Sequence, residues 1–412
     1  MFYIVFFITS CIATGLFFYA KSKVESHNDA SFNTFQRSYI TIYALAVAGD
    51  WLQGPHVYAL YQSYGMSKHQ IELLFIAGFG SSLLFGTVVG SFADKFGRRW
   101  NCFLYGILYS ISCLTKHIPA IEVLMVGRLL GGIATSILFS AFESWLIFEH
   151  NKRGFSEQML GTIFSNAALS NSVIAILSGA VAQFAADQFG FVAPFDVALI
   201  VLGIMSILVL NNWSENYGNE RAPIQESFSK AAQLIRSDHR VLCLGLVQSL
   251  FEGAMYTFVL EWTPAITQAA PIGAPIPHGL IFASFMVAAM IGSSLFKILT
   301  RFTSVENLMR YVLLTSSICL SIPLIFPFSL PVVFIGFLVF ELCVGIFWPS
   351  MACLRSSYLP EETRSTTINL FRIPLNFIVI AILLQNLSMH SIFQCCSVFL
   401  ILAAGAQHIL YR

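Results

Sequence analysis

Long apolar stretches recur along the 412-residue chain, with short polar segments between them. A helix needs about 20 apolar residues to cross the hydrocarbon core of a bilayer, so each stretch predicts one membrane span. The predicted spans number thirteen, at residues 2–20, 38–62, 70–93, 101–117, 119–148, 159–184, 191–211, 240–266, 279–299, 308–326, 330–352, 366–387 and 391–411. They divide as one span followed by two groups of six.

The longest polar interruption, at about 212–239, separates the two groups of six. We therefore expect an anchor helix with a cytoplasmic linker, a six-helix bundle, a cytoplasmic inter-bundle loop and a second six-helix bundle, at 1–37, 38–211, 212–239 and 240–412. A signal peptide is the alternative for the first span. No basic residue precedes its apolar run, and Lys21 and Lys23 follow it, which favours a retained helix.

Composition supports a membrane protein, because 57% of the residues are hydrophobic and only 10% are charged. Soluble domains carry roughly 25% charged residues. The fold class we expect is an all-α integral membrane protein. The formal net charge of +1 gives no reason to expect nucleic acid as a partner, and the nine cysteines have no metal-site or redox spacing. We expect no metal and no cofactor.

Basic residues define the expected orientation, because cytoplasmic loops are enriched in Lys and Arg. With the first span running inward, all but four of the 22 Lys and Arg residues fall on the cytoplasmic side. Lys68 and Lys116 fall outside, and Arg128 and Arg372 lie within spans. This distribution places the N-terminus outside and the C-terminus in the cytoplasm.

The segment between spans 70–93 and 101–117 carries a charged glycine motif made of Gly90, Asp94, Gly97, Arg98 and Arg99. It resembles the signature loop of the major facilitator superfamily, so we expect that fold. Gly97 permits a tight turn after the helix. A charge network of Asp94 with the cations can hold one conformation and release it in another, which predicts a conformational latch.

The two groups of six also resemble each other faintly. Residues 80–85 are similar to residues 292–296, and Asp50 and Glu252 fall at comparable depths in the first span of each group. Major facilitator transporters consist of two related halves, with the substrate site between them near the bilayer midplane.

Several stretches resemble a smaller branch, the eukaryotic molybdate-anion transporter family. The similarity runs across nearly the whole chain and is carried by residues 49–53, 140–145, 250–252, 262–264, 347–351 and 371–375. The resemblance implies a secondary transporter that takes up molybdate across the plasma membrane by alternating access.

Arg372 is the candidate for contact with an anion. A charge near the bilayer centre costs at least about 2.5–3.5 kcal/mol, so it indicates function. Asn369, Arg372 and Asn376 share one helical face by their spacing and supply the donors that a tetrahedral dianion needs. A structural ion pair is the alternative for Arg372, and it is favoured for Arg128. The other predicted substrate-binding residues are Arg128, Asn166, Gln53 and Tyr256.

Acidic residues within the spans are expected to pair with cations or to carry a proton. These are Asp50, Glu252, Glu143 and Glu341. Asp50 and Glu252 would repel an anion when ionised, so we do not expect both to be direct ligands. A buried unpaired carboxylate suits proton coupling, which would offset the charge of an imported dianion.

Two other functions stay open at this point. One is a major facilitator carrier of another small solute, such as a sugar, an amine or an organic anion. The other is a membrane sensor that does not transport. An enzyme or an ATP-driven pump is disfavoured, because the chain has no nucleophile elbow and no Walker-type phosphate loop. We expect a monomer in the lipid bilayer.

Overall fold

The computed structural model describes residues 1–23, 30–218, 224–271, 276–385 and 387–411. Every regular element in these ranges is a helix, which confirms the all-α fold class. The elements are α1 (Phe2–Lys23), α2 (Ala30–Trp51), η1 (Gly54–His56), α3 (Val57–Ser63), α4 (Lys68–Phe96), α5 (Arg98–Thr115), α6 (Ile121–Leu138), α7 (Ala141–Lys152), α8 (Glu157–Phe189), α9 (Ala193–Asn212), α10 (Ile224–Ser237), α11 (His239–Ala269), α12 (His278–Leu299), α13 (Val305–Ile325), α14 (Leu330–Tyr358), η2 (Glu361–Thr363), α15 (Arg364–Gln385) and α16 (Met389–Tyr411).

In the described part of the chain, ten candidate spans are long and apolar enough to cross a membrane. An eleventh is obtained if the two halves of α4, which are bent by 48°, count as one span. Of the thirteen predicted spans, those at α2 and α5 do not reach this apolarity. Several of their polar side chains face the protein interior: Asp50 lines a cavity, and Arg98 and Asn101 are fully buried.

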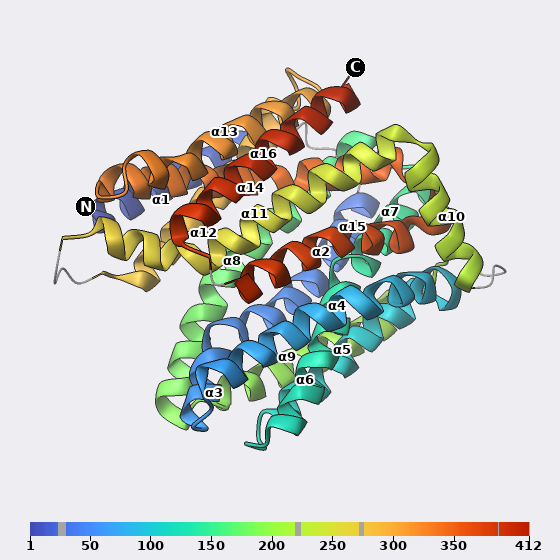
Figure 1. Ribbon diagram of the computed structural model, residues 1–412. Helices are drawn as coiled ribbons and strands as arrows, with labels where there is room; N and C mark the ends of the chain where they lie inside the picture. The colour runs from blue at the N-terminus through green and yellow to red at the C-terminus, as the bar shows by residue number, and fades with distance from the viewer. Residues whose placement is uncertain (24–29, 219–223, 272–275, 386, 412) are drawn as a thin grey trace.

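The helices form two bundles, each with its own apolar core (Figure 1). The first bundle contains α2 to α9 and buries Tyr105 and Phe142. The second contains α11 to α16 and buries Phe258 and Phe337. In Figure 1 the bundles lie closest at the end that carries α10 and diverge toward the end that carries α3. These are called the α10 end and the α3 end below.

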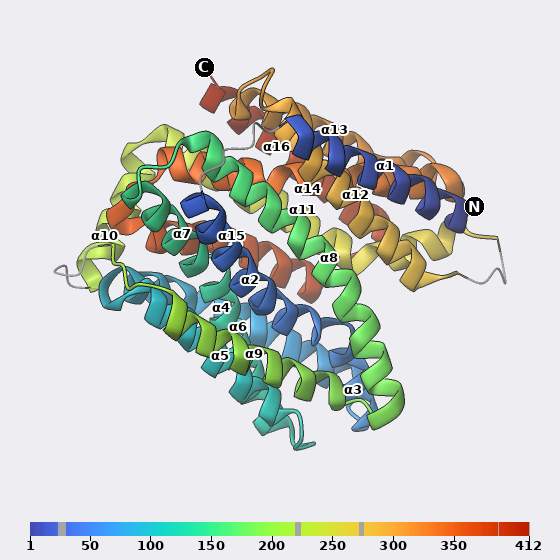
Figure 2. The ribbon, with the colours of Figure 1, turned by 180° about the vertical axis from the view of Figure 1, so that it is seen from behind.

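Helix α1 packs on the second bundle although it precedes the first in sequence. Ala13 contacts Val287 and Ile291 of α12 in a small apolar cluster, and Phe2 meets Phe334 edge-on at 5.0 Å between ring centroids. Figure 2 shows α1 running along this bundle. The predicted linker falls partly on residues 24–29, which lie outside the described ranges, and α2 begins at Ala30, before the predicted start of its span.

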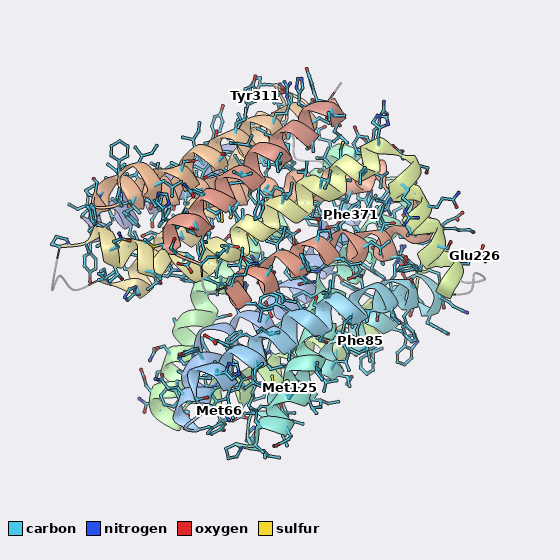
Figure 3. All side chains as sticks on the ribbon, viewed as in Figure 1. Met66, Phe85, Met125, Glu226, Tyr311 and Phe371 are labelled. Atoms are coloured by element: carbon cyan, nitrogen blue, oxygen red, sulfur yellow. The ribbon has the colours of Figure 1, made fainter. Side chains whose placement is uncertain are left out.

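Apolar side chains cover the outer faces of both bundles. Phe85 on α4 and Tyr311 on α13 project outward and are 45% and 60% exposed (Figure 3). Phe371 instead lies between α15 and α11, against Gly245. Outward apolar and inward polar side chains are the arrangement expected of a protein surrounded by lipid.

The polar segment between the bundles is not only a loop, as the sequence suggested, because residues 224–237 form helix α10. Its Ser227 and Ala231 are buried, and it packs against α4, α11 and α15. Exposed Glu226 and Lys230 pair on its other face at 2.8 Å. The helix is short and amphipathic, which explains why a search for apolar spans passes over it.

Candidate functional site

A cavity of about 470 Å³ lies between the two bundles. Helices α2, α4, α5, α6, α7 and α8 of the first bundle and α11, α12, α14 and α15 of the second supply its lining. The lining reaches Val57 and Lys116 toward the α3 end and Glu143 and Arg355 toward the α10 end. Most of the lining is apolar or aromatic, so the few charged groups stand out.

Arg372 of α15 is buried in the cavity wall and is incompletely paired. Its Nη1 lies 3.7 Å from Oε2 of Glu252 on α11, which is an ion pair beyond hydrogen-bond distance. Within the described part of the chain, Nε and Nη1 of Arg372 have no hydrogen-bond partner, and neither has Oε2 of Glu252. The guanidinium carbon lies 4.6 Å from the centre of the Phe139 ring, so the first bundle contacts this second-bundle cation.

A break between α6 and α7 places Phe139 and Glu143 in this cavity. One continuous span was predicted over 119–148, but the helix ends at Leu138 and resumes at Ala141. Ser140 adopts non-helical backbone angles and stabilises the break by donating from its hydroxyl to the Ser136 carbonyl at 2.7 Å. Predicted span 38–62 is similarly divided, at Gly54 and Pro55, because proline lacks the N–H that a continuing helix needs.

Asn376 lines the cavity one helical turn beyond Arg372. Its Nδ2 donates to Oγ of Ser82 on α4 at 3.3 Å, and Ser82 shares a 2.8 Å hydrogen bond with Ser136 on α6. Asn376 thus connects α15 to the first bundle at the level of Arg372.

Asn369 does not line the cavity, contrary to the shared-face expectation. Its Nδ2 donates to the Ser365 carbonyl at 3.0 Å, and its side chain lies against Gly86 and Gly90 of α4. Helix α4 crosses α15 at this point and covers Asn369. One helical turn later the same face of α15 lines the cavity, at Arg372.

Asn166 was also expected in the cavity, and the structure places it elsewhere. Its Nδ2 donates to Gln36 at 3.1 Å, and its Oδ1 accepts from Nζ of Lys297 at 2.5 Å. It therefore connects α2, α8 and α12 outside the cavity wall. Asn166 was predicted from the similarity of the two halves of the chain. That similarity relates whole helices and does not fix the direction of one side chain.

Gln53, Tyr256 and Arg128 do line the cavity. Gln53 is fixed by a 2.8 Å hydrogen bond from Nε2 to the Gly49 carbonyl. Arg128 donates from Nε to the Leu74 carbonyl at 3.1 Å and lies over the Phe75 ring at 4.7 Å. No carboxylate lies within ion-pair distance of Arg128 among the described residues, although pairing with an acid was the favoured expectation.

The acidic residues of the cavity have different partners. Asp50 accepts a hydrogen bond from the Tyr109 hydroxyl, and Glu252 faces Arg372. Glu341 on α14 lines the cavity without a hydrogen bond to any described residue. Neither Asp50 nor Glu341 has a cation within ion-pair distance in the described ranges.

Glu143 forms a bidentate ion pair between the bundles. Arg355 of α14 donates from Nε to Oε1 of Glu143 at 2.7 Å and from Nη2 to Oε2 at 2.5 Å. Its Nη1 donates to Gln248 of α11 at 3.0 Å. The sequence suggested a partner in the cytoplasmic loops, and counted Arg355 there, but Arg355 is a buried helical residue at the α10 end of the cavity.

The glycine motif closes the bundles together at the α10 end. Asp94 and Arg98, both fully buried, pair at 2.9 Å. Asp94 also accepts from the backbone N–H and hydroxyl of Thr366 on α15 at 3.0 and 2.9 Å. Arg98 pairs with Glu361 of η2, which also pairs with Arg364. The motif is therefore engaged with the second bundle in this conformation.

The two glycines of the motif have separate steric roles. A Cβ at Gly90 would lie 2.7 Å from the Ser365 carbonyl oxygen, so glycine lets α4 and α15 approach closely. Gly97 has φ +111°, and the Glu215 carboxylate occupies the space of a Cβ there. Glu215 in turn accepts from the Arg99 and Trp100 N–H groups at 2.8 and 3.1 Å.

The sequence did not identify several residues of this network, namely Glu215, Arg355, Glu361 and Thr366. Each has a partner far away in the chain, from 116 positions between Glu215 and Arg99 to 272 positions between Thr366 and Asp94. Arg355, Glu361 and Thr366 meet these partners where the two bundles come together, and Glu215 meets Arg99 within the first bundle. One local feature of the sequence pointed to this network. Glu361 and Glu362 come just before a basic residue at the start of a helix.

Weakening the latch should slow transport without removing the protein from the membrane. Asp94→Asn keeps the size of the side chain but removes the charge that faces Arg98. We expect a lower maximal uptake rate at equal surface level, because the closed α10 end loses part of its stabilisation. Surface biotinylation with initial-rate uptake measures this, and an unchanged rate would remove the latch from the account.

Two helical bundles around a cavity that holds a few charged groups, with a charge network at one end, define a transporter of the major facilitator class. Solved structures share this fold. The human organic anion transporter MFSD10 matches with TM-score 0.69 and 14% identity, over 90% of this chain and 99% of that one. The E. coli fucose:proton symporter FucP matches with TM-score 0.72 and 13% identity, over 92% and 99%.

The sequence comparisons give the family. Residues 1–347 match a family model described as "Sugar-transporters, 12 TM". The molybdate-anion transporter of Xenopus laevis is 35% identical over 397 residues, covering 90% of this chain and 85% of that protein. That of Takifugu rubripes is 32% identical over 383 residues, covering 84% and 78%. The chain belongs to the molybdate-anion transporter family of the major facilitator superfamily, whose members are transporters and not enzymes.

Proposed function

We propose that the chain carries molybdate, or a similar tetrahedral oxyanion, across the plasma membrane by alternating access. The observation that carries this proposal is Arg372, whose buried guanidinium retains two unpartnered nitrogens in a cavity between the bundles. An anion at this position would receive charge-assisted hydrogen bonds from a planar fork. The names of the relatives support molybdate, whereas the family model's description concerns sugars.

A sugar is uncharged, so its binding would not require a buried cation whose nitrogens lack hydrogen-bond partners. Sugar hydroxyls exchange ordinary hydrogen bonds, and Gln53 and Tyr256 of the cavity lining could provide such bonds. The free N–H donors of Arg372 favour a ligand with negatively charged acceptor oxygens, because the Glu252 carboxylate lies beyond hydrogen-bond distance. We therefore prefer the oxyanion to the sugar.

The proposed direction of transport is import, and this conformation of the protein is proposed to be open to the outside. The positive-inside rule assigns the α10 end, which carries the charged motif, to the cytoplasm. With the α10 end closed by the latch and by Glu143 with Arg355, the cavity opens toward the α3 end. The N-terminus then lies outside and the C-terminus inside, and the single chain holds the complete cavity, which supports a working monomer.

Competition for uptake tests this proposal against other solutes. Cells that express the chain should take up molybdate saturably at nanomolar concentration. Excess tungstate and sulfate should inhibit, because they share the tetrahedral dianion geometry, whereas fucose should not. Inhibition by sugars with no effect of tungstate would overturn the proposed substrate and leave the class intact.

Asp50 is the proposed proton carrier. It lines the cavity, has the hydroxyl of Tyr109 as its partner and has no cation within ion-pair distance in the described ranges. Proton entry with the dianion would offset the inward negative charge. Vesicles that contain the protein and an internal pH dye should acidify when molybdate is added outside, and the Asp50→Asn protein should not acidify them. Molybdate uptake with no acidification by the unmodified protein would exclude coupling.

A further inference from the structure

Lys116 is a buried cation that the proposed Arg372 site does not use. It follows α5 directly, is 1% exposed and lines the cavity toward its α3 end. Its Nζ has no hydrogen-bond partner among the described residues and lies 5.6 Å from the centre of the Tyr61 ring. The sequence placed Lys116 at the outer end of predicted span 101–117, and the structure buries it and fixes its backbone with a 2.5 Å hydrogen bond from the Tyr64 hydroxyl.

Helix α6, which carries Arg128, packs against the Lys116 side chain. A Cβ at Gly127, the residue before Arg128, would be 3.2 Å from Nζ of Lys116. Arg128 uses Nε on the Leu74 carbonyl and lines the same cavity. Asp50 is the acid within electrostatic reach of Arg128, and it already accepts from Tyr109.

Two neighbouring cations without a carboxylate partner are unfavourable in a buried position. Like charges repel strongly where water is scarce, and each ammonium or guanidinium loses its hydration. Cations so placed are held in proteins by pairing with an anion. Among the described residues no carboxylate lies within ion-pair distance of Lys116 or Arg128, so a bound anion would supply the missing counter-charge.

We propose that Lys116 and Arg128 form a second anion site at the α3 end of the cavity, separate from Arg372. Its ligand is a tetrahedral dianion such as molybdate, tungstate or sulfate, so the inference rests on the proposed function and deepens it. The ammonium supplies a point charge and the guanidinium supplies a fork. The site receives the anion from outside before it passes to Arg372.

Binding stoichiometry tests the second site directly. Equilibrium dialysis of the purified protein against radiolabelled molybdate should give two anions per chain. Lys116→Met, which removes the charge and keeps an unbranched chain, should give one, and Lys116→Arg should restore two. Arg372→Ala should also give one, and the Lys116→Met, Arg372→Ala double variant should give none.

The outcomes separate the two proposals. One anion per chain, unaffected by Lys116→Met and lost in Arg372→Ala, would overturn the second site and leave the proposed function standing. No binding of molybdate, tungstate or sulfate to the folded unmodified protein would overturn both.

Folding and kinetics distinguish a binding role from a structural one. Without anion, Lys116→Met should unfold at a temperature at least as high as the unmodified protein, because an unpaired buried charge is removed. Its KM for molybdate uptake should rise about tenfold with little change in maximal rate, as expected when one charge-assisted contact is lost. If Lys116→Met does not fold, Arg128→Gln provides the same stoichiometry test. An unchanged KM in a folded variant would contradict the proposal.

Discussion

Arg372→Ala is expected to abolish saturable molybdate uptake while the protein still reaches the surface. A hydrogen bond to a charged group contributes about 1.5–3 kcal/mol, so the loss of two from the guanidinium lowers kcat/KM by at least about a hundredfold. Initial-rate uptake at nanomolar molybdate, normalised to surface level, measures the effect.

Two further variants control this experiment. Arg372→Lys keeps the charge but loses the planar fork, so an intermediate loss is expected. Arg301→Ala removes an exposed arginine after α12 and should leave uptake unchanged. Full uptake by Arg372→Ala would move the substrate site away from α15 and would make the ion pair with Glu252 a structural one.

Breaking the pair of Glu143 with Arg355 is expected to have the second largest effect. This contact joins α7 of the first bundle to α14 of the second at the closed α10 end. Removing one partner of a buried pair costs about 3–5 kcal/mol, because the other charge is left without a counter-charge. Glu143→Gln or Arg355→Gln should therefore shift the population toward the state that is open at the α10 end.

Spin labels on the two bundles at the α10 end would measure this shift as a longer distance. The exchanged double variant, Glu143→Arg with Arg355→Glu, should recover part of the short distance and part of the uptake. Gln248 also contacts Arg355, so full recovery is not expected. Distance distributions that stay the same in both single variants would show that the pair does not hold the closed state.

Much of the fold could be predicted from local patterns. Apolar stretches of sufficient length identify most helices, and the motif from Gly90 to Arg99 identifies the class because its residues lie within one short stretch of sequence. Helix α10 was missed because its apolar face is narrow, and the break at Ser140 was missed because no proline or glycine marks it.

The site could be predicted only in part. Arg372, Asn376 and Arg128 line the cavity, as predicted. They could be predicted because a polar group inside a membrane span indicates function wherever it occurs in the sequence. Asn369 and Asn166 do not line the cavity, because helical spacing gives a shared face without saying which neighbouring helix covers each turn. Lys116 and Arg355 were not predicted to line the cavity. A cation at the edge of an apolar stretch can lie either at the membrane surface or in the protein interior.

Uptake of labelled molybdate into liposomes that contain only the purified protein tests the central claim most directly. The account predicts saturable uptake that excess tungstate blocks and that Arg372→Ala protein does not support. Uptake no greater than in protein-free liposomes, by protein shown to be folded, would contradict the claim that this chain carries oxyanions.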